Sequence, residues 1–250
     1  MAPLTRRNVF YIFKNIFYLV DMRALLLMIL AMAACIAGCV YFYGEKISGP
    51  PAAGAEVIKL PAPLLKGDTS VEEAIFNRRS IREFRDGPLT LREVSRLLWA
   101  AQGITGRGRT TPSAGGLYPL EVYVAAGNVE GIAPGVYKYA PDGHELLKVA
   151  GGDKRAELSD AALGQASVKN GAADFIIAGV YERTTGKYGE QGTKYVYMEA
   201  GHAAQNVYLE AVSLHLGTVS IGAFYDDGVK KATGMGDDER PLYIMPVGRI

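Results

Sequence analysis

The sequence predicts an α+β domain over residues 70–250, preceded by one N-terminal membrane helix. Helix and strand patterns follow one another in this domain without the regular strand–helix–strand order of a parallel α/β sheet. The run Asp174–Tyr181 (DFIIAGVY) is apolar and rich in β-branched residues, as expected of a buried strand. The pattern from Lys194 to Leu216 suits one long helix that is apolar over most of its girth. Such a helix should be central, or buried against another subunit.

The membrane helix is predicted at residues 24–44, which carry no charge and end in the aromatic run Tyr41–Tyr43. At a rise of about 1.5 Å per residue, this stretch is long enough for a hydrocarbon layer of about 30 Å. The preceding segment, residues 1–23, is basic. The positive-inside rule therefore predicts a single-pass membrane protein with its main domain outside the cytoplasm.

Two other targeting signals overlap this stretch. Residues 36–39 (IAGC) resemble a lipoprotein processing box, which would leave a lipidated Cys39, and Thr5–Arg7 resembles a twin-arginine signal. We favour a plain signal anchor, because short motifs of small or basic residues are common at such N-termini.

The remaining elements follow in chain order. Residues 45–69 are rich in proline and glycine and predict a semi-extended tether. Ser70–Glu73 and Thr90–Glu93 have the spacing of helix capping boxes. Further strands are predicted at 120–125, 136–139, 218–221 and 242–247, and further helices at 154–163 and 226–233. Gly217 is expected to stop the long helix.

Composition excludes several function classes. The 27 basic and 26 acidic side chains nearly balance, which argues against a nucleic-acid binder. Cys35 and Cys39 are the only cysteines, so the main domain has no thiol nucleophile and no cysteine-ligated metal. We therefore predict no metal site. His144 is expected at the surface, and His202 in the core, where Glu199 could pair with it.

A basic cluster is the first candidate binding site. Arg78, Arg79, Ser80 and Arg82 place three guanidinium groups and a hydroxyl within five residues, which suits phosphate binding. A solvated helix end would account for the same pattern. No nucleotide-binding glycine motif of the P-loop or Rossmann type accompanies it.

A glycine loop is the second candidate. Its residues, Pro112, Ser113, Ala114, Gly115 and Gly116, are nearly free of side chains, so backbone amides can approach a flat or anionic ligand. Gly222 and Ala223 offer similar backbone donors after a strand. Either segment, taken alone, could be an ordinary loop.

Nine ordered blocks of residues 58–249 match one family: RRSIREF (78–84), LLWAAQGIT (97–105), PSAGGLYPLEVYV (112–124), GVYKY (135–139), LGQ (163–165), KYGEQGTKY (187–195), EAGHAAQN (199–206), IGAF (221–224) and PVGR (246–249). With these blocks the chain resembles the nitroreductase family of flavoproteins, in particular its SagB-type (thiazole/oxazole) dehydrogenase branch.

The resemblance implies a homodimer with an antiparallel or mixed sheet, the long helix at the dimer interface, and FMN bound between subunits. It implies that the basic cluster holds the phosphate and ribityl chain, with Arg249 as a further phosphate partner. The glycine loop would line the flavin ring from the neighbouring subunit, and Gln165, Gly222 and Ala223 would also face the flavin. Lys187 and Tyr188 match the catalytic Lys-Tyr pair of azole-forming members. Gln191 and Lys194 depart from the family, which often has arginines there.

The implied activity is an FMN-dependent oxidoreductase that transfers hydride through flavin N5. A peptide azoline oxidised to an azole and a nitro or quinone acceptor reduced with NAD(P)H remain alternative substrates. A non-catalytic flavin-binding module tethered to the membrane remains the alternative function.

Overall fold

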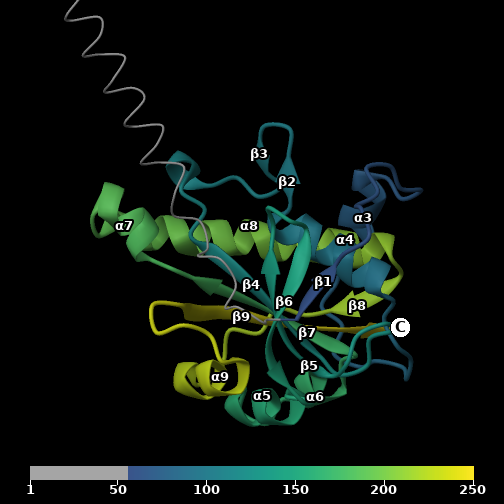
Figure 1. Ribbon diagram of the computed structural model, residues 1–250. Coiled ribbons are helices and arrows are strands. Elements are labelled where there is room, and N and C mark those ends of the chain that lie inside the picture. Colours follow the sequence, from purple (N-terminus) through teal and green to yellow (C-terminus); the bar gives the residue numbers. More distant parts are fainter. Residues whose placement is uncertain (1–55) are drawn as a thin grey trace, which may run out of the picture. The chain divides into compact units, whose positions relative to one another are not determined.

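The structure, a computed structural model, describes residues 56–250 and contains one seven-stranded sheet (Figure 1). The strand order is β1 (Val57–Lys59), β6 (Glu145–Gly151), β5 (Gly135–Ala140), β4 (Leu120–Ala126), β7 (Ala173–Gly179), β9 (Arg240–Arg249) and β8 (Leu216–Thr218). Every neighbouring pair is antiparallel. A separate hairpin joins β2 (Ile104–Thr105) to β3 (Gly108–Arg109). The predicted α+β class is confirmed.

Helices cover both faces of this sheet. On one face lie α4 (Leu91–Gln102) and α8 (Gln191–Ser213), and on the other lie α5 (Arg155–Ala161), α6 (Ala166–Asn170) and α9 (Asp226–Thr233) (Figure 1). The short helices α3 (Val71–Asn77) and α7 (Glu182–Tyr188) pack against α8 at its two ends (Figure 1).

The strand β7 shows why the sheet is buried on both sides. Its side chains alternate between the two faces. Phe175 and Ile177 join the core formed with α4 and α8, whereas Ile176 joins the core formed with α5 and α9. The apolar run read from the sequence is therefore a central strand between two helical layers.

Local signals placed several elements correctly. Thr90 caps α4: its hydroxyl accepts from the Glu93 amide, and the Glu93 carboxylate accepts from the Thr90 amide at 2.7 Å. Helix α9 has the predicted bounds, Asp226–Thr233.

The end of the long helix differs from the prediction. Helix α8 stops at Ser213, and His215, not a glycine, takes the left-handed conformation after it, with φ of 55°. Gly217 lies inside β8, where an added Cβ would come within 2.6 Å of Ile250 and 2.8 Å of Ile81. Close packing is thus the reason for this glycine.

The N-terminal side of the domain also differs. Val57–Lys59, expected in the tether, forms the edge strand β1 beside β6. Within residues 56–250, no helix is both long and apolar enough to cross a membrane. The helix predicted at residues 24–44 lies outside the described part of the chain.

Candidate functional site

The glycine loop forms a tight turn, η1 (Ala114–Gly116), in which Gly115 and Gly116 have φ of 64° and 65°. Residues that carry a Cβ rarely adopt this backbone conformation, which explains why both positions are glycine. Ser113 closes the turn, because its hydroxyl oxygen accepts the Tyr118 amide at 2.9 Å. The loop therefore presents backbone at the surface.

Lys187 and Tyr188, at the end of α7, lie directly against this loop. A Cβ added to Gly115 would be 2.7 Å from the Tyr188 hydroxyl and 3.0 Å from the Lys187 ammonium nitrogen. The ammonium also lies 5.4 Å from the centre of the Tyr188 ring. The structure thus brings the two residues predicted as catalytic together with the predicted ring-binding loop.

Arg183 fixes α7 relative to the loop. Its guanidinium donates to the Tyr118 carbonyl at 3.1 Å and pairs with the buried Glu121 carboxylate at 2.5 Å. Sequence reasoning missed this pair. A usable signal was present, since Glu121 is a charged residue within an otherwise apolar strand pattern.

A second group of polar side chains lies beneath the loop. Glu199 on α8 is 2% exposed and Gln102 on α4 is 1% exposed. Burial raises the pKa of the Glu199 carboxyl to about 7, although Ser113, the Arg109 guanidinium and Gln102 each favour the carboxylate. Arg109 in turn donates to the Gln102 side-chain oxygen at 3.2 Å. A carboxyl group that titrates near neutral pH therefore lies under the loop.

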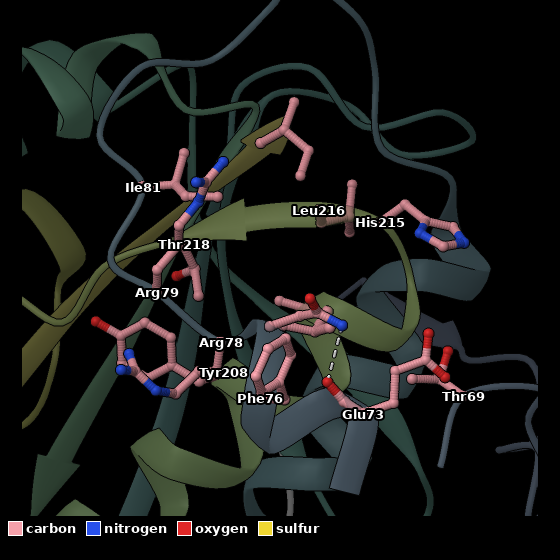
Figure 2. A pocket seen from close by; sticks show the side chains of 14 residues that line it. Thr69, Glu73, Phe76, Arg78, Arg79, Ile81, Tyr208, His215, Leu216 and Thr218 are labelled. Carbon is pink, nitrogen blue, oxygen red and sulfur yellow. Dashed lines mark hydrogen bonds between the residues drawn. The ribbon is translucent and has the colours of Figure 1, made fainter. Parts of the chain in front are cut away.

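The basic cluster is separate from this group, and two of its residues contact Tyr208 on α8. The Arg78 guanidinium lies 5.1 Å from the centre of the Tyr208 ring (Figure 2). The Ser80 and Tyr208 hydroxyl oxygens are 3.0 Å apart. The Ser220 amide donates to the Tyr208 hydroxyl at 2.8 Å. Burial raises the pKa of Tyr208, but bonds from Ser220 and Ser80 outweigh it and the pKa is lowered. Tyr208 was missed, because in the sequence it reads as an ordinary core position.

A cavity of about 470 Å³ opens beside this cluster (Figure 2). Arg78, Arg79 and Tyr208 line it together with Phe76, whose side chain is 88% exposed. Ser80 and Arg82 lie at the exposed surface. The cavity combines cationic side chains with an apolar wall.

Gln165 and the loop after β8 also meet. The Gln165 side-chain amide donates to the Ala223 carbonyl at 3.2 Å, and both Gly222 and Ala223 are exposed. Because Ser220 is held by Tyr208, this segment connects the basic cluster to Gln165.

Arg249 is bonded within the chain. Its guanidinium forms two bonds to the Glu93 carboxylate, at 2.6 and 2.8 Å, and two to the Pro88 carbonyl, at 3.0 and 2.7 Å. The structure thus uses Arg249 to join the last strand to the start of α4.

The positions of His202 and His144 differ from the predicted ones. His202, expected in the core, is exposed, whereas His144, expected at the surface, is hydrogen-bonded to the Ser95 and Tyr139 hydroxyls, both at 2.8 Å.

The predicted site residues form two groups along α8. The glycine loop contacts Tyr188, just before the helix begins at Gln191, and reaches Glu199 through Ser113, whereas the basic cluster contacts Tyr208 near the helix end. Glu199 and Tyr208 are nine positions apart, about 13 Å at about 1.5 Å per residue.

Similar proteins agree with this fold. A Methanocaldococcus jannaschii protein named as a nitroreductase is 49% identical over 184 residues, which cover 73% of this chain and 92% of that protein. A crystal structure from Anabaena variabilis, also named as a nitroreductase, has a TM-score of 0.71 and 29% identity over 84% of this chain. The matched part covers 46% of that relative's chain.

Two more distant structures share the fold alone. The E. coli microcin synthetase McbBCD complex, solved with truncated pro-MccB17 bound, matches with a TM-score of 0.60 and 22% identity, covering 94% of this chain and 96% of that one. The NADPH:FMN oxidoreductase from Vibrio harveyi, complexed with NAD+, matches with a TM-score of 0.53 and 22% identity over 72% and 68%. The nitroreductase family model matches residues 75–249. The chain is therefore a member of the nitroreductase family and, with it, an oxidoreductase.

Proposed function

We propose that the protein is an FMN-dependent oxidoreductase that works as a homodimer. The observation that carries this proposal is the contact between Gly115 of the glycine loop and the Lys187–Tyr188 pair. It places a backbone surface suited to a flat ring next to groups that can exchange a proton. Bound FMN would supply hydride transfer through its N5 atom.

The residues present fit such a cofactor. A Cβ on Gly116 would meet nothing within 4 Å, so the loop surface above the turn is open. Ser80, Arg78 and Arg82 supply a hydroxyl and two cations for a phosphate. Gly222 and Ala223 add exposed backbone near Gln165.

The exposed surface of α8 supports the dimer. A second copy with its α8 running in the opposite direction would bring the loop of one subunit to the basic cluster of the other. Tyr197 and Met198, which are 55% and 48% exposed on α8, provide apolar surface for this contact.

Lys187 and Tyr188 are proposed as the catalytic residues. Either side chain can hold or deliver the proton that accompanies hydride transfer, which is ordinary general acid–base chemistry.

Two substrate classes suit this proposal. The likeness to the microcin synthetase complex supports a peptide azoline as substrate, in keeping with the SagB-type branch. The likeness to the NADPH:FMN oxidoreductase supports reduction of nitro or quinone acceptors with NAD(P)H. We further propose that residues 24–44 attach the chain to a membrane with the domain outside the cytoplasm, which would favour a lipid-soluble quinone.

The test uses protein purified without added cofactor. A visible flavin spectrum, release of FMN on denaturation, and loss of colour in R78A and R82A would support the cofactor and its site. Protein that is colourless and takes up no added FMN contradicts the proposal. Bound FMN that neither NAD(P)H nor an azoline peptide reduces would favour the non-catalytic module instead.

A further inference from the structure

The polar group beneath the glycine loop has no task in the proposed chemistry. Glu199 comes from α8, Gln102 from α4 and Ser113 from the loop, so three separate segments meet there. Glu199 Oε1 and the Gln102 amide nitrogen are buried and form no hydrogen bond of standard geometry within residues 56–250. Gln102 nevertheless stabilises the ionised form of the Glu199 carboxyl group. A buried polar group without such a bond lowers the stability of the folded state, so its presence in a native protein calls for an explanation.

We propose that Glu199 is a positioning residue that tightens or loosens the glycine loop, through Ser113, according to whether its carboxyl group carries a proton. The inference rests on the proposed function, because it assigns this control to the loop that would line the flavin.

A chain of polar contacts links the carboxyl to the loop. The Tyr118 amide donates to the Ser113 hydroxyl oxygen at 2.9 Å, which leaves the hydroxyl proton free to face Glu199. Ser113 favours the ionised form of Glu199. Because hydrogen bonds to a charged acceptor are stronger than bonds to a neutral one, ionisation of Glu199 fixes Ser113 and closes the turn more firmly.

Within residues 56–250, the one charge that acts on Glu199 is the guanidinium of Arg109, a residue of β3. Gln102 faces it from α4 as a neutral amide. On α7, Lys187 meets the outer side of the loop at Gly115, and on α8 itself the exposed His202 lies one turn further along. The pKa of about 7 for Glu199 supports a change of state in the physiological range.

The first measurement needs no cofactor. Hydrogen exchange of the peptide covering residues 112–118 is followed at pH 6 and pH 8, with rates divided by those of the unfolded peptide at the same pH. We expect loop protection to be about five-fold higher at pH 8, the difference between a charged and a neutral hydrogen bond. E199Q should remove this pH dependence because glutamine does not titrate. S113A should remove it as well, since it breaks the link and keeps the carboxyl.

Asp174→Asn is the matched control. Like Glu199, Asp174 is a buried carboxyl group whose pKa is raised by burial, but it lies on β7 and has different neighbours. This variant should keep the pH response of the loop. Equal corrected protection at pH 6 and pH 8 in the unmodified protein, or an unchanged response in both E199Q and S113A, overturns the inference.

The second measurement separates this inference from the proposed function. FMN is titrated at both pH values, and its affinity should rise about five-fold at pH 8 in the unmodified protein only. Absence of FMN binding at either pH contradicts the proposed function, while the exchange experiment still decides the role of Glu199. FMN binding of equal strength at both pH values contradicts the inference alone.

Discussion

Gly115 and Tyr188 lie so close that a single methyl group on the glycine would come within 2.7 Å of the tyrosine hydroxyl. The backbone of the glycine loop therefore packs directly against side chains at the end of α7. Arg183, one helical turn before Lys187, holds the same helix to the Tyr118 carbonyl at the other end of the loop.

Gly115→Ala is expected to destabilise the protein by about 1–3 kcal/mol, because alanine is strained at a positive φ and its methyl group would displace Tyr188. Thermal unfolding and retention of FMN are the measurements. Gly116→Ala is the matched control, since φ is again positive, 65°, but no atom lies within 4 Å of the added Cβ. Equal loss of FMN in both variants would show that the contact with Tyr188 is unimportant.

Arg249→Gln is expected to lower the free energy of unfolding by about 1–3 kcal/mol, because it leaves the Glu93 carboxylate without its cation. Arg240→Gln, which removes a mostly exposed pair with Glu182 at 3.8 Å, should cost less than about 1 kcal/mol. Chemical denaturation measures both.

Burial raises the pKa of Glu93, but the bonds from Arg249 and Thr90 outweigh it and the pKa is lowered. A lowered pKa gives stability above the ordinary value of about 4.5, which is lost as the pH falls through the folded-state value. The Arg249→Gln variant should therefore show a smaller loss of stability in acid than the unmodified protein. A variant as stable as the unmodified protein that binds FMN more weakly would instead assign Arg249 to the phosphate.

Tyr208→Phe removes the hydroxyl that contacts both Ser80 and the Ser220 amide. We expect FMN affinity to fall about ten-fold, the equivalent of losing roughly one or two hydrogen bonds, with the fold intact by circular dichroism. Tyr137→Phe, which loses one bond to the Ala133 carbonyl elsewhere in the core, should leave FMN affinity unchanged. Comparable losses in the two variants would indicate a general effect on packing.

Stability should also depend on His144. Burial lowers the pKa of its imidazole below the usual 6.5. The unfolded chain then takes up a proton before the folded one does, so stability present above about pH 6.5 is lost as the pH falls below it. His144→Asn keeps a residue that tolerates the positive φ of 46°. Urea unfolding between pH 5.5 and 7.5 should show a weaker pH dependence in this variant, and an identical slope would rule out His144 as the cause.

Sequence patterns predicted those elements that depend on interactions between residues close together in the chain. The capping box at Thr90, the buried strand around Phe175 and the helix at Asp226–Thr233 each depend on neighbouring residues, and each was found. The resemblance marked Gly115 and Tyr188 as site residues, and the structure shows that the two are neighbours.

Long-range pairing explains the rest. Arg249 meets Glu93 across 156 positions of sequence, and nothing near either residue signals this partner. Likewise, Gly217 reads as a helix stop, yet its small size serves the packing of Ile81 and Ile250. The two roles of a glycine look alike until the tertiary neighbours are known.

The short strand β1 has a practical consequence for how the domain is cut out of the chain. It covers β6, which would otherwise be the outermost strand of the sheet. A fragment beginning at residue 61 would expose the free backbone edge of β6, and exposed edges invite pairing between molecules. Protein produced from residue 56 onward should therefore resist self-association better than the shorter piece, although only a few residues distinguish them.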